Sequence, residues 1–309
     1  MEDGVRMRRC VSCGGEVSGD WCGNCGERVR RPGEVSLGEY LGEFFEELTN
    51  LNGKLWGSLR ALVFSPGKLT HEYMLGRRVP WMRPLHLFLL INLLYFLLSG
   101  WNTFNTPLYA HMSFNNFPHK ELAISWTNQA INDPAVADDQ WHRVISQMHL
   151  SSPDLSEQGR EIHQRLREYA AEFDRKTDIY ARTLIISLIP LMTLLPSLIF
   201  IRRREGPVRH LVFTTHWMSW FLLLSIPTGL ITMELLKRGF VGYQSWIEEA
   251  ISSSLIVCFM LLWSVPAFRR VYGLGWIGAG LSALAMIFWL VLALNVYRSI
   301  LFFVVHWTI

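Results

Sequence analysis

Four of the five cysteines form two closely spaced pairs near the N-terminus: Cys10 with Cys13, and Cys22 with Cys25. Two thiolates separated by two residues on a tight turn form one half of a metal site. Two such halves supply the tetrahedral four-sulfur set that suits structural Zn²⁺. The sequence therefore predicts one structural Zn²⁺ per chain, with all four ligand positions filled by protein and none open for catalysis. Iron in a rubredoxin-like site and redox chemistry of the cysteine pairs are the alternatives.

Glycine follows the second cysteine of each pair, at Gly14 and Gly26. Glycine accepts a positive φ without steric cost, so both positions suit a backbone that turns around an ion. A segment this short has no core of its own, and metal binding and folding are then one event. We assign residues 1–33 to a zinc ribbon.

Half of the 309 residues are hydrophobic, and the apolar residues gather in five runs. Each run approaches the ~20 residues that a helix needs to cross a bilayer. The fold class expected is an all-α polytopic membrane protein with about five transmembrane helices and a small N-terminal zinc ribbon. The first thirty residues are polar and basic and lack a secretory signal, so the first span is expected to direct insertion. The five spans are expected at about 85–101, 183–201, 211–236, 250–268 and 274–297.

Basic residues in the short flanks of the spans indicate the orientation, because Lys and Arg gather on the cytosolic side. They place the N-terminus and the Arg202–Arg204 cluster in the cytosol and residues 102–178 outside, where eleven acids face seven Lys and Arg. The expected location is the inner membrane of a bacterium. Residues 295–309 remain open: they span, re-enter or lie on the membrane. The domains are 1–33 (ribbon), 34–83 (amphipathic cytosolic helices), 84–101 (first span), 102–178 (external helical segment) and 179–309 (second to fifth spans).

Residues 34–83 carry apolar side chains at helical spacing, from Leu37 to Leu62, and basic residues suited to the inner leaflet. Ser65 and Pro66 read as an N-cap and a first helical residue, which predicts a second short helix there. Gly76 is placed to end that helix. The arginines that follow Gly76 are expected to hold the helix end to phosphates or to backbone carbonyls.

The same segment resembles an uncharacterised bacterial family of multi-span membrane proteins. The resemblance covers roughly residues 10–100 and implies an N-terminal double-CxxC ribbon, several spans and an inner-membrane location, but no known activity. The matching residues are Phe64, Pro66, Gly67, Tyr73, Gly76, Arg77, Arg78 and Pro84.

Two further patterns are better explained by packing or by chance than by chemistry. Gly273, Gly275 and Gly278 fit the dinucleotide-binding pattern, but they open a predicted span rather than a strand–helix unit. Close helix packing on a face of small residues, Gly275, Ala279 and Ala283, is the expected reading. Five histidines of the external segment are expected to be scattered rather than joined in a site: His111, His119, His142, His149 and His163.

These features favour a non-enzymatic adaptor or assembly component whose ribbon docks a protein partner. The alternative is a transporter or channel for a small solute or lipid, with spans kinked by prolines as the path. An enzyme acting on a membrane lipid is a third class, and no catalytic residues are assigned. The expected partners are the lipid bilayer and a protein at the ribbon; self-association is left open. A net charge of +3 does not favour nucleic acid.

Overall fold

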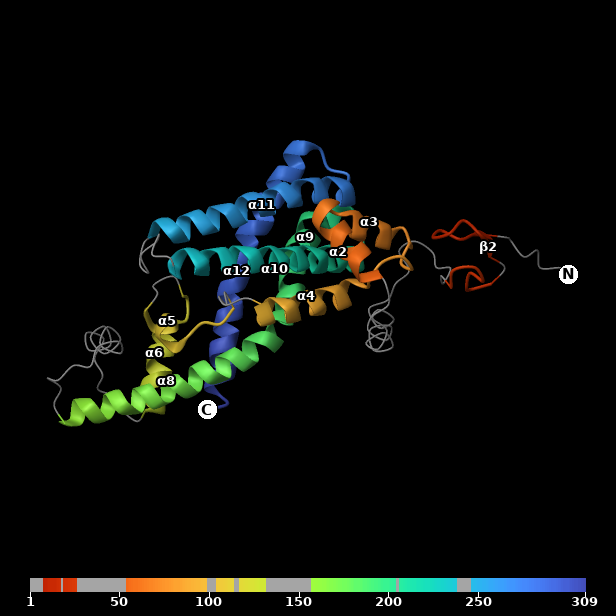
Figure 1. The fold of residues 1–309 in the computed structure, drawn as a ribbon. Helices are drawn as coiled ribbons and strands as arrows, with labels where there is room; N and C mark the ends of the chain where they lie inside the picture. Colours follow the sequence, from red (N-terminus) through yellow and green to blue (C-terminus); the bar gives the residue numbers. More distant parts are fainter. Residues whose placement is uncertain are drawn as a thin grey trace. The chain divides into compact units, whose positions relative to one another are not determined.

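The computed structural model is built of helices, with one small strand pair near the N-terminus (Figure 1). It falls into two compact units, residues 1–101 with 189–290 and residues 102–188 with 291–309. The residues that the structure describes are 8–17, 19–26, 54–98, 104–113, 117–131, 157–203, 206–237 and 246–309. The first part of the helix predicted from Leu37 to Leu62, up to residue 53, lies outside these ranges.

The first unit holds the strand pair and most of the apolar helices. Two helices cross the boundary between the units: α9 begins one residue before it, and α12 continues past it into the second unit. The elements are β1 (Arg8–Arg9), β2 (Glu16–Val17), α2 (Lys54–Phe64), α3 (Lys68–Met74), α4 (Pro84–Leu98), α9 (Leu188–Ile199), η2 (Ile201–Arg203), α10 (Pro207–Lys237), α11 (Trp246–Tyr272) and α12 (Trp276–His306).

Among the described residues, three helical stretches are long and apolar enough to cross a membrane, which indicates a membrane protein. They are Gln164–Ile199, Ser254–Tyr272 and Trp276–His306, and they correspond to the predicted second, fourth and fifth spans. The predicted first span is α4, an apolar helix of 15 residues. At about 1.5 Å per residue its length falls short of a ~30 Å hydrocarbon core. The total of five spans therefore stays a prediction.

The predicted third span, α10, is the central helix of the first unit. It contacts α4, α11, α3 and α2, and nearly every side chain from residue 210 to 226 is buried. Helices on several sides shield it, so it can carry polar residues that a lipid-facing helix could not. Its buried polar residues include His210, Thr214, Thr215, His216 and Ser219.

The turn between α2 and α3 differs from the expectation. Pro66 was predicted at the first helical position, but α3 begins at Lys68, after a turn that contains both Pro66 and Gly67. Gly67 adopts φ 73°, a left-handed conformation, which interrupts the helical path. A Cβ on Gly67 would lie 2.9 Å from the Cα of Ala267 in α11. The backbone turns here because α11 passes too close for any side chain.

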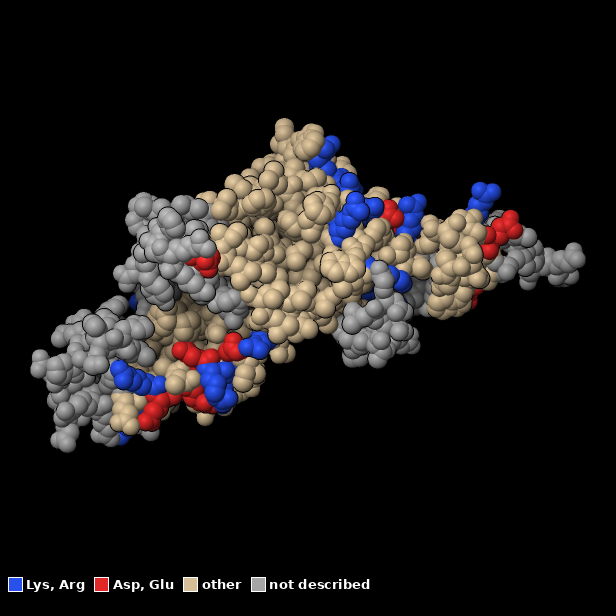
Figure 2. Space-filling model, viewed as in Figure 1, with Lys and Arg blue, Asp and Glu red and all other residues tan. Residues whose placement is uncertain are grey.

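The second unit contains α5 (Leu108–Ser113), α6 (Lys120–Ala130), α8 (Glu157–Leu184), η1 (Ile185–Ser187) and the last part of α12. The helical face predicted for α8 is confirmed, because Leu166 and Phe173 are buried. The opposite face is charged, and Figure 2 shows Lys, Arg, Asp and Glu gathered along this helix. Ion pairs one turn apart hold these charges, as between Arg182 and Asp178.

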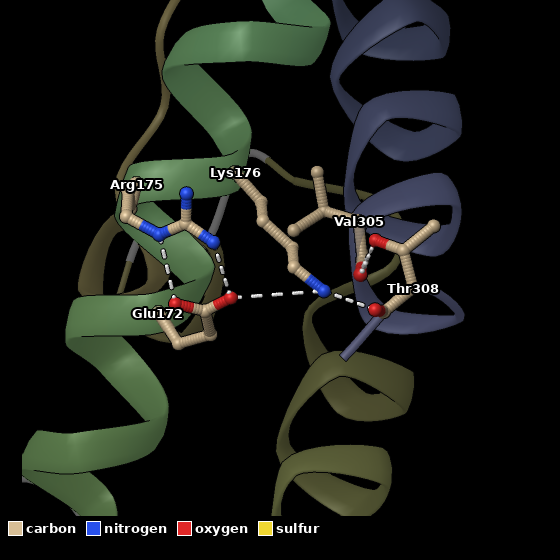
Figure 3. A network of polar contacts seen from close by, with 5 residues as sticks. All are labelled: Glu172, Arg175, Lys176, Val305 and Thr308. Atoms are coloured by element: carbon tan, nitrogen blue, oxygen red, sulfur yellow. Dashed lines mark hydrogen bonds and ion pairs between the residues drawn. The ribbon is translucent and has the colours of Figure 1, made fainter.

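Helix α12 continues without interruption to His306, so residues 295–306 prolong the helix of the fifth predicted span. Its end is tied to α8: the ammonium of Lys176 donates to the carbonyl of Thr308 and lies 3.7 Å from a carboxylate oxygen of Glu172 (Figure 3). The Thr308 hydroxyl donates to the carbonyl of Val305 at 2.8 Å. Another prediction, that no break separates residue 161 from residue 188, is also confirmed, since α8, η1 and α9 follow one another directly.

Candidate metal centre

The ribbon is a short antiparallel strand pair with a knuckle turn at each cysteine pair. Arg8 pairs with Val17 and Arg9 with Glu16. At the first turn the N–H of Gly14 donates to the carbonyl of Cys10 at 2.9 Å, and Gly14 has φ 77°. The second turn repeats this geometry, with Gly26 donating to Cys22 at 2.8 Å and φ 71°. The predicted left-handed glycines are confirmed at both turns.

The two turns bring all four cysteine sulfurs together. The four Sγ atoms lie within 4.8 Å of one another, and both Cys10–Cys25 and Cys13–Cys22 are 3.6 Å apart. Four sulfurs at about 2.3 Å from a central ion stand about 3.8 Å apart along the edges of a regular tetrahedron. The cysteines therefore have the spacing needed to hold one metal ion.

Hydrogen bonds at one sulfur favour the thiolate that a metal requires. The backbone N–H of Gly15 and the sulfurs of neighbouring cysteines lower the pKa of the Cys13 thiol from 9.0 to about 7, with the Gly15 bond the largest cause. The side-chain amide of Asn24 adds a donor 3.7 Å from the same sulfur. Because metals bind the deprotonated sulfur, these contacts prepare Cys13 as a ligand.

The ribbon has apolar side chains both in its small core and exposed on its surface. Cys10, Val17 and Cys22 form its small buried core. By contrast Val11, in the first turn, is 48% exposed, and Trp21, immediately before the second pair, is 63% exposed. A tryptophan exposed on so small a module is available for contact with another molecule.

Four residues of the motif that carries the family resemblance lie at the end of α3: Tyr73, Gly76, Arg77 and Arg78. Gly76 adopts φ 85°, its N–H donates to the carbonyl of Tyr73 at 3.1 Å, and the N–H of Arg77 donates to Glu72 at 3.0 Å. These two bonds are a Schellman motif, so the prediction that Gly76 ends the helix is confirmed. Arg77 binds a backbone carbonyl, as expected, but it is that of Val11 in the ribbon, to which its Nε donates at 3.2 Å, rather than one at the helix end. The Arg77 side chain pairs with the Glu72 carboxylate at 3.4 Å, and the Arg78 guanidinium stands 4.4 Å over the Tyr73 ring.

Tertiary contacts fix this segment to the helices of the first unit. Thr70 hydrogen-bonds the buried His216 of α10 at 2.8 Å. From α11, Trp263 donates to the carbonyl of Leu62 at 2.6 Å and Arg270 to that of Pro66 at 2.8 Å. The segment therefore acts as a packing module. Sequence reasoning missed the three partners, since they lie more than 140 positions away and follow no local pattern.

Pro84 opens α4 as predicted and is buried there. The glycine-rich pattern is not part of a strand–helix unit, since the residues described around it are helical. The expected packing face is confirmed at Ala279 and Ala283, which are fully buried. Gly275 is exposed, so that face begins one turn later than predicted.

The structure brings two of the predicted external histidines together, contrary to the expectation that they are scattered. His111 and His119 are hydrogen-bonded to each other within the second unit. His142 and His149 lie outside the described residues, as does the side chain of His163.

The fold and the site together define a helical membrane protein with four N-terminal cysteines that could hold a metal ion. Residues 52–96 match the model of a family described as Protein of unknown function (DUF3667). The match spans α2, α3 and nearly all of α4, the packing module of the first unit. Searches of curated proteins and of solved structures each found no match.

Proposed function

We propose that this chain is a multi-pass protein of the bacterial inner membrane whose cytosolic zinc ribbon docks a protein partner. In this proposal it is a non-enzymatic adaptor or assembly component. The observation that carries the proposal is the tetrahedral spacing of the four cysteine sulfurs, with 3.6 Å between partners of different pairs.

A site with four protein sulfurs favours zinc with a structural role. Such a shell has no open position for water or substrate, unlike catalytic zinc sites with three protein ligands. Its contribution is to hold a small module rigid, and rigid surfaces bind partners with less entropic cost. Val11 and Trp21 would supply the apolar anchors, in keeping with the large share of binding energy that tryptophan carries at interfaces.

Site-directed crosslinking tests this role in the full chain. A photoreactive amino acid at position 21 is expected to crosslink one protein partner in cells. The crosslink should be lost when Cys22→Ser removes a zinc ligand. The matched control is the same photoreactive residue at Glu16, which is exposed on the same ribbon but is polar. Deletion of residues 1–33 should leave an inserted protein that has lost its partner; if every partner remains, docking by the ribbon is wrong.

One observation favours the alternative, a transporter or channel. Among the described residues, Thr214 Oγ1, His216 Nε2 and Trp220 Nε1 of α10 are buried without a hydrogen-bond partner. Buried polar atoms left unpaired cost about 1–3 kcal/mol each, so their presence in the central helix suits a path for a polar species. Proton flux into dye-loaded vesicles tests this reading, with His216→Phe expected to abolish any flux. Equal proton flux in vesicles with and without the protein would contradict a proton path.

A further inference from the structure

The ends of all three candidate spans meet at one place in the first unit. The stretch Gln164–Ile199 ends just before η2, Ser254–Tyr272 ends at the aromatic Tyr272, and Trp276–His306 begins four residues later. Contacts join these ends: the Phe200 and Tyr272 rings stack at 4.1 Å, and Arg203 donates to the Tyr272 carbonyl. A place where spans end together lies at the boundary between hydrocarbon and headgroups.

An exposed tryptophan, Trp276, lies at this same boundary between hydrocarbon and headgroups. Trp276 is 64% exposed, and the Arg269 guanidinium lies 3.6 Å from the centre of its ring. Tryptophan is enriched at the headgroup level, where its ring meets both apolar and polar surroundings. Because Arg269 stacks on the Trp276 ring, its guanidinium is held at the headgroup level as well.

Three arginines gather at this boundary: Arg203, Arg269 and Arg270. Arg203 donates to the Tyr272 carbonyl and stands 5.4 Å over the Phe200 ring, Arg269 lies over the Trp276 ring, and Arg270 donates to the Pro66 carbonyl. Within the part of the chain that the structure describes, none of the three forms an ion pair with a carboxylate. Their positive charges are therefore not compensated by described acids, and their side chains have already lost part of their conformational freedom.

We propose that Arg203, Arg269 and Arg270 form a binding site for the phosphate of an anionic phospholipid. The planar guanidinium donates two parallel hydrogen bonds to phosphate oxygens, which a lysine cannot do. Basic pockets between membrane helices bind anionic headgroups in this way. A zwitterionic headgroup carries an ammonium that offsets the phosphate, so the site prefers lipids with net negative charge.

Native mass spectrometry of the purified full chain measures this preference. Phosphatidylglycerol is expected to bind with a lower Kd than phosphatidylcholine of the same acyl chains. Arg269→Gln with Arg270→Gln should raise the Kd for phosphatidylglycerol at least about tenfold, while the Kd for phosphatidylcholine stays unchanged. The single variant Arg269→Gln should give a smaller rise in the Kd for phosphatidylglycerol. It replaces the double variant in this test if the double variant does not fold.

The matched control removes the same two charges elsewhere in the first unit. Lys54→Gln with Arg60→Gln changes two exposed side chains of α2 and should leave the Kd for phosphatidylglycerol within about twofold. Equal rises in both double variants would mean that only net charge attracts the lipid, and the site would be refuted. Equal binding of the two lipids by the unaltered chain, or binding of sodium phosphate as tight as that of phosphatidylglycerol, would refute it as well.

Discussion

His111 Nδ1 and His119 Nε2 lie 2.8 Å apart in the second unit, and both side chains are buried. The rest of the network assigns the protons. Ser299 donates its hydroxyl to the Asn295 carbonyl at 2.9 Å, so at 2.7 Å it accepts from His119 Nδ1. His119 Nε2 then accepts from His111 Nδ1–H. His111 Nε2 carries no proton and is buried without a partner. This assignment holds for two neutral rings, the form that burial favours by lowering the pKa of both histidines.

Acid is expected to destabilise the second unit through these two histidines. Burial lowers the pKa of His111 from 6.5 to about 3, aided by the charges of His119 and Arg298, and burial lowers that of His119 to about 4. The unfolded chain then binds more protons than the folded one below about pH 6.5. Stability is full above this pH and falls as the pH drops towards 4, by about 1.4 kcal/mol per pH unit for His111 alone.

Hydrogen–deuterium exchange of residues 118–131, corrected for intrinsic rates, measures this loss of protection between pH 7 and pH 4.5. Other titratable groups nearby are Tyr169 and Asp174 on α8 and His306 on α12, so variants are needed to assign the effect. His111→Phe should flatten the pH dependence, and the control His71→Gln, in the first unit, should not change it. An unchanged slope in His111→Phe would contradict the assignment.

One equivalent of zinc per chain is expected in the purified protein. The four sulfurs have the spacing of a tetrahedral shell, and removal of one ligand leaves three thiolates around an open site. Elemental analysis should show that Cys22→Ser lowers the zinc content severalfold, while Cys258→Ser, outside the ribbon, leaves it unchanged. Iron in the unaltered protein, or full zinc content in Cys22→Ser, would refute the prediction.

Labelling of single cysteines tests the orientation in the membrane. In a background with all five native cysteines replaced by alanine, a cysteine at Ala130 should react with an impermeant maleimide added to intact cells. A cysteine at Gly206 should react only after the membrane is permeabilised. Both positions are exposed in the structure, so a difference in labelling reports the side of the membrane. The reverse pattern would overturn the topology, together with the argument that the cysteines stay reduced in the cytosol.

Three glycine-to-alanine variants should separate steric from conformational effects. Gly67→Ala should lower the free energy of unfolding by about 2 kcal/mol or more, because its Cβ meets Ala267 and its φ is left-handed. Gly76→Ala has open space and should cost about 1 kcal/mol for its left-handed φ alone. Gly57→Ala lies inside α2 with its nearest neighbour 3.9 Å away, so it should gain about 0.5–1 kcal/mol. Thermal unfolding checks the order, and equal losses at Gly67 and Gly76 would contradict the close approach.

Local chemistry explains why some features could be predicted. The spacing of the cysteines and the glycines after them specifies two knuckle turns, because each turn closes within five residues. Gly76 likewise ends α3 through bonds to its own helix. Apolar runs of span length identify helices because the bilayer allows little else.

Other features depend on residues far apart in the chain. The Pro66-Gly67 pair is a local turn signal, but nothing local reveals that α11 passes so close to Gly67, since Ala267 lies 200 residues further along the chain. Likewise the number of spans stays a prediction, because burial against neighbouring helices lets α10 carry polar residues that lower its hydropathy.

The sequence by itself determined which four cysteines could hold a metal ion, the helical class and the helix-ending glycine, since short-range geometry and hydrophobicity decide them. Only the tertiary structure decided that His111 meets His119, that Gly67 lies against α11 and that three arginines gather where spans end. Side-chain pairs of this kind depend on how helices pack, and helix packing depends on contacts summed over the whole fold.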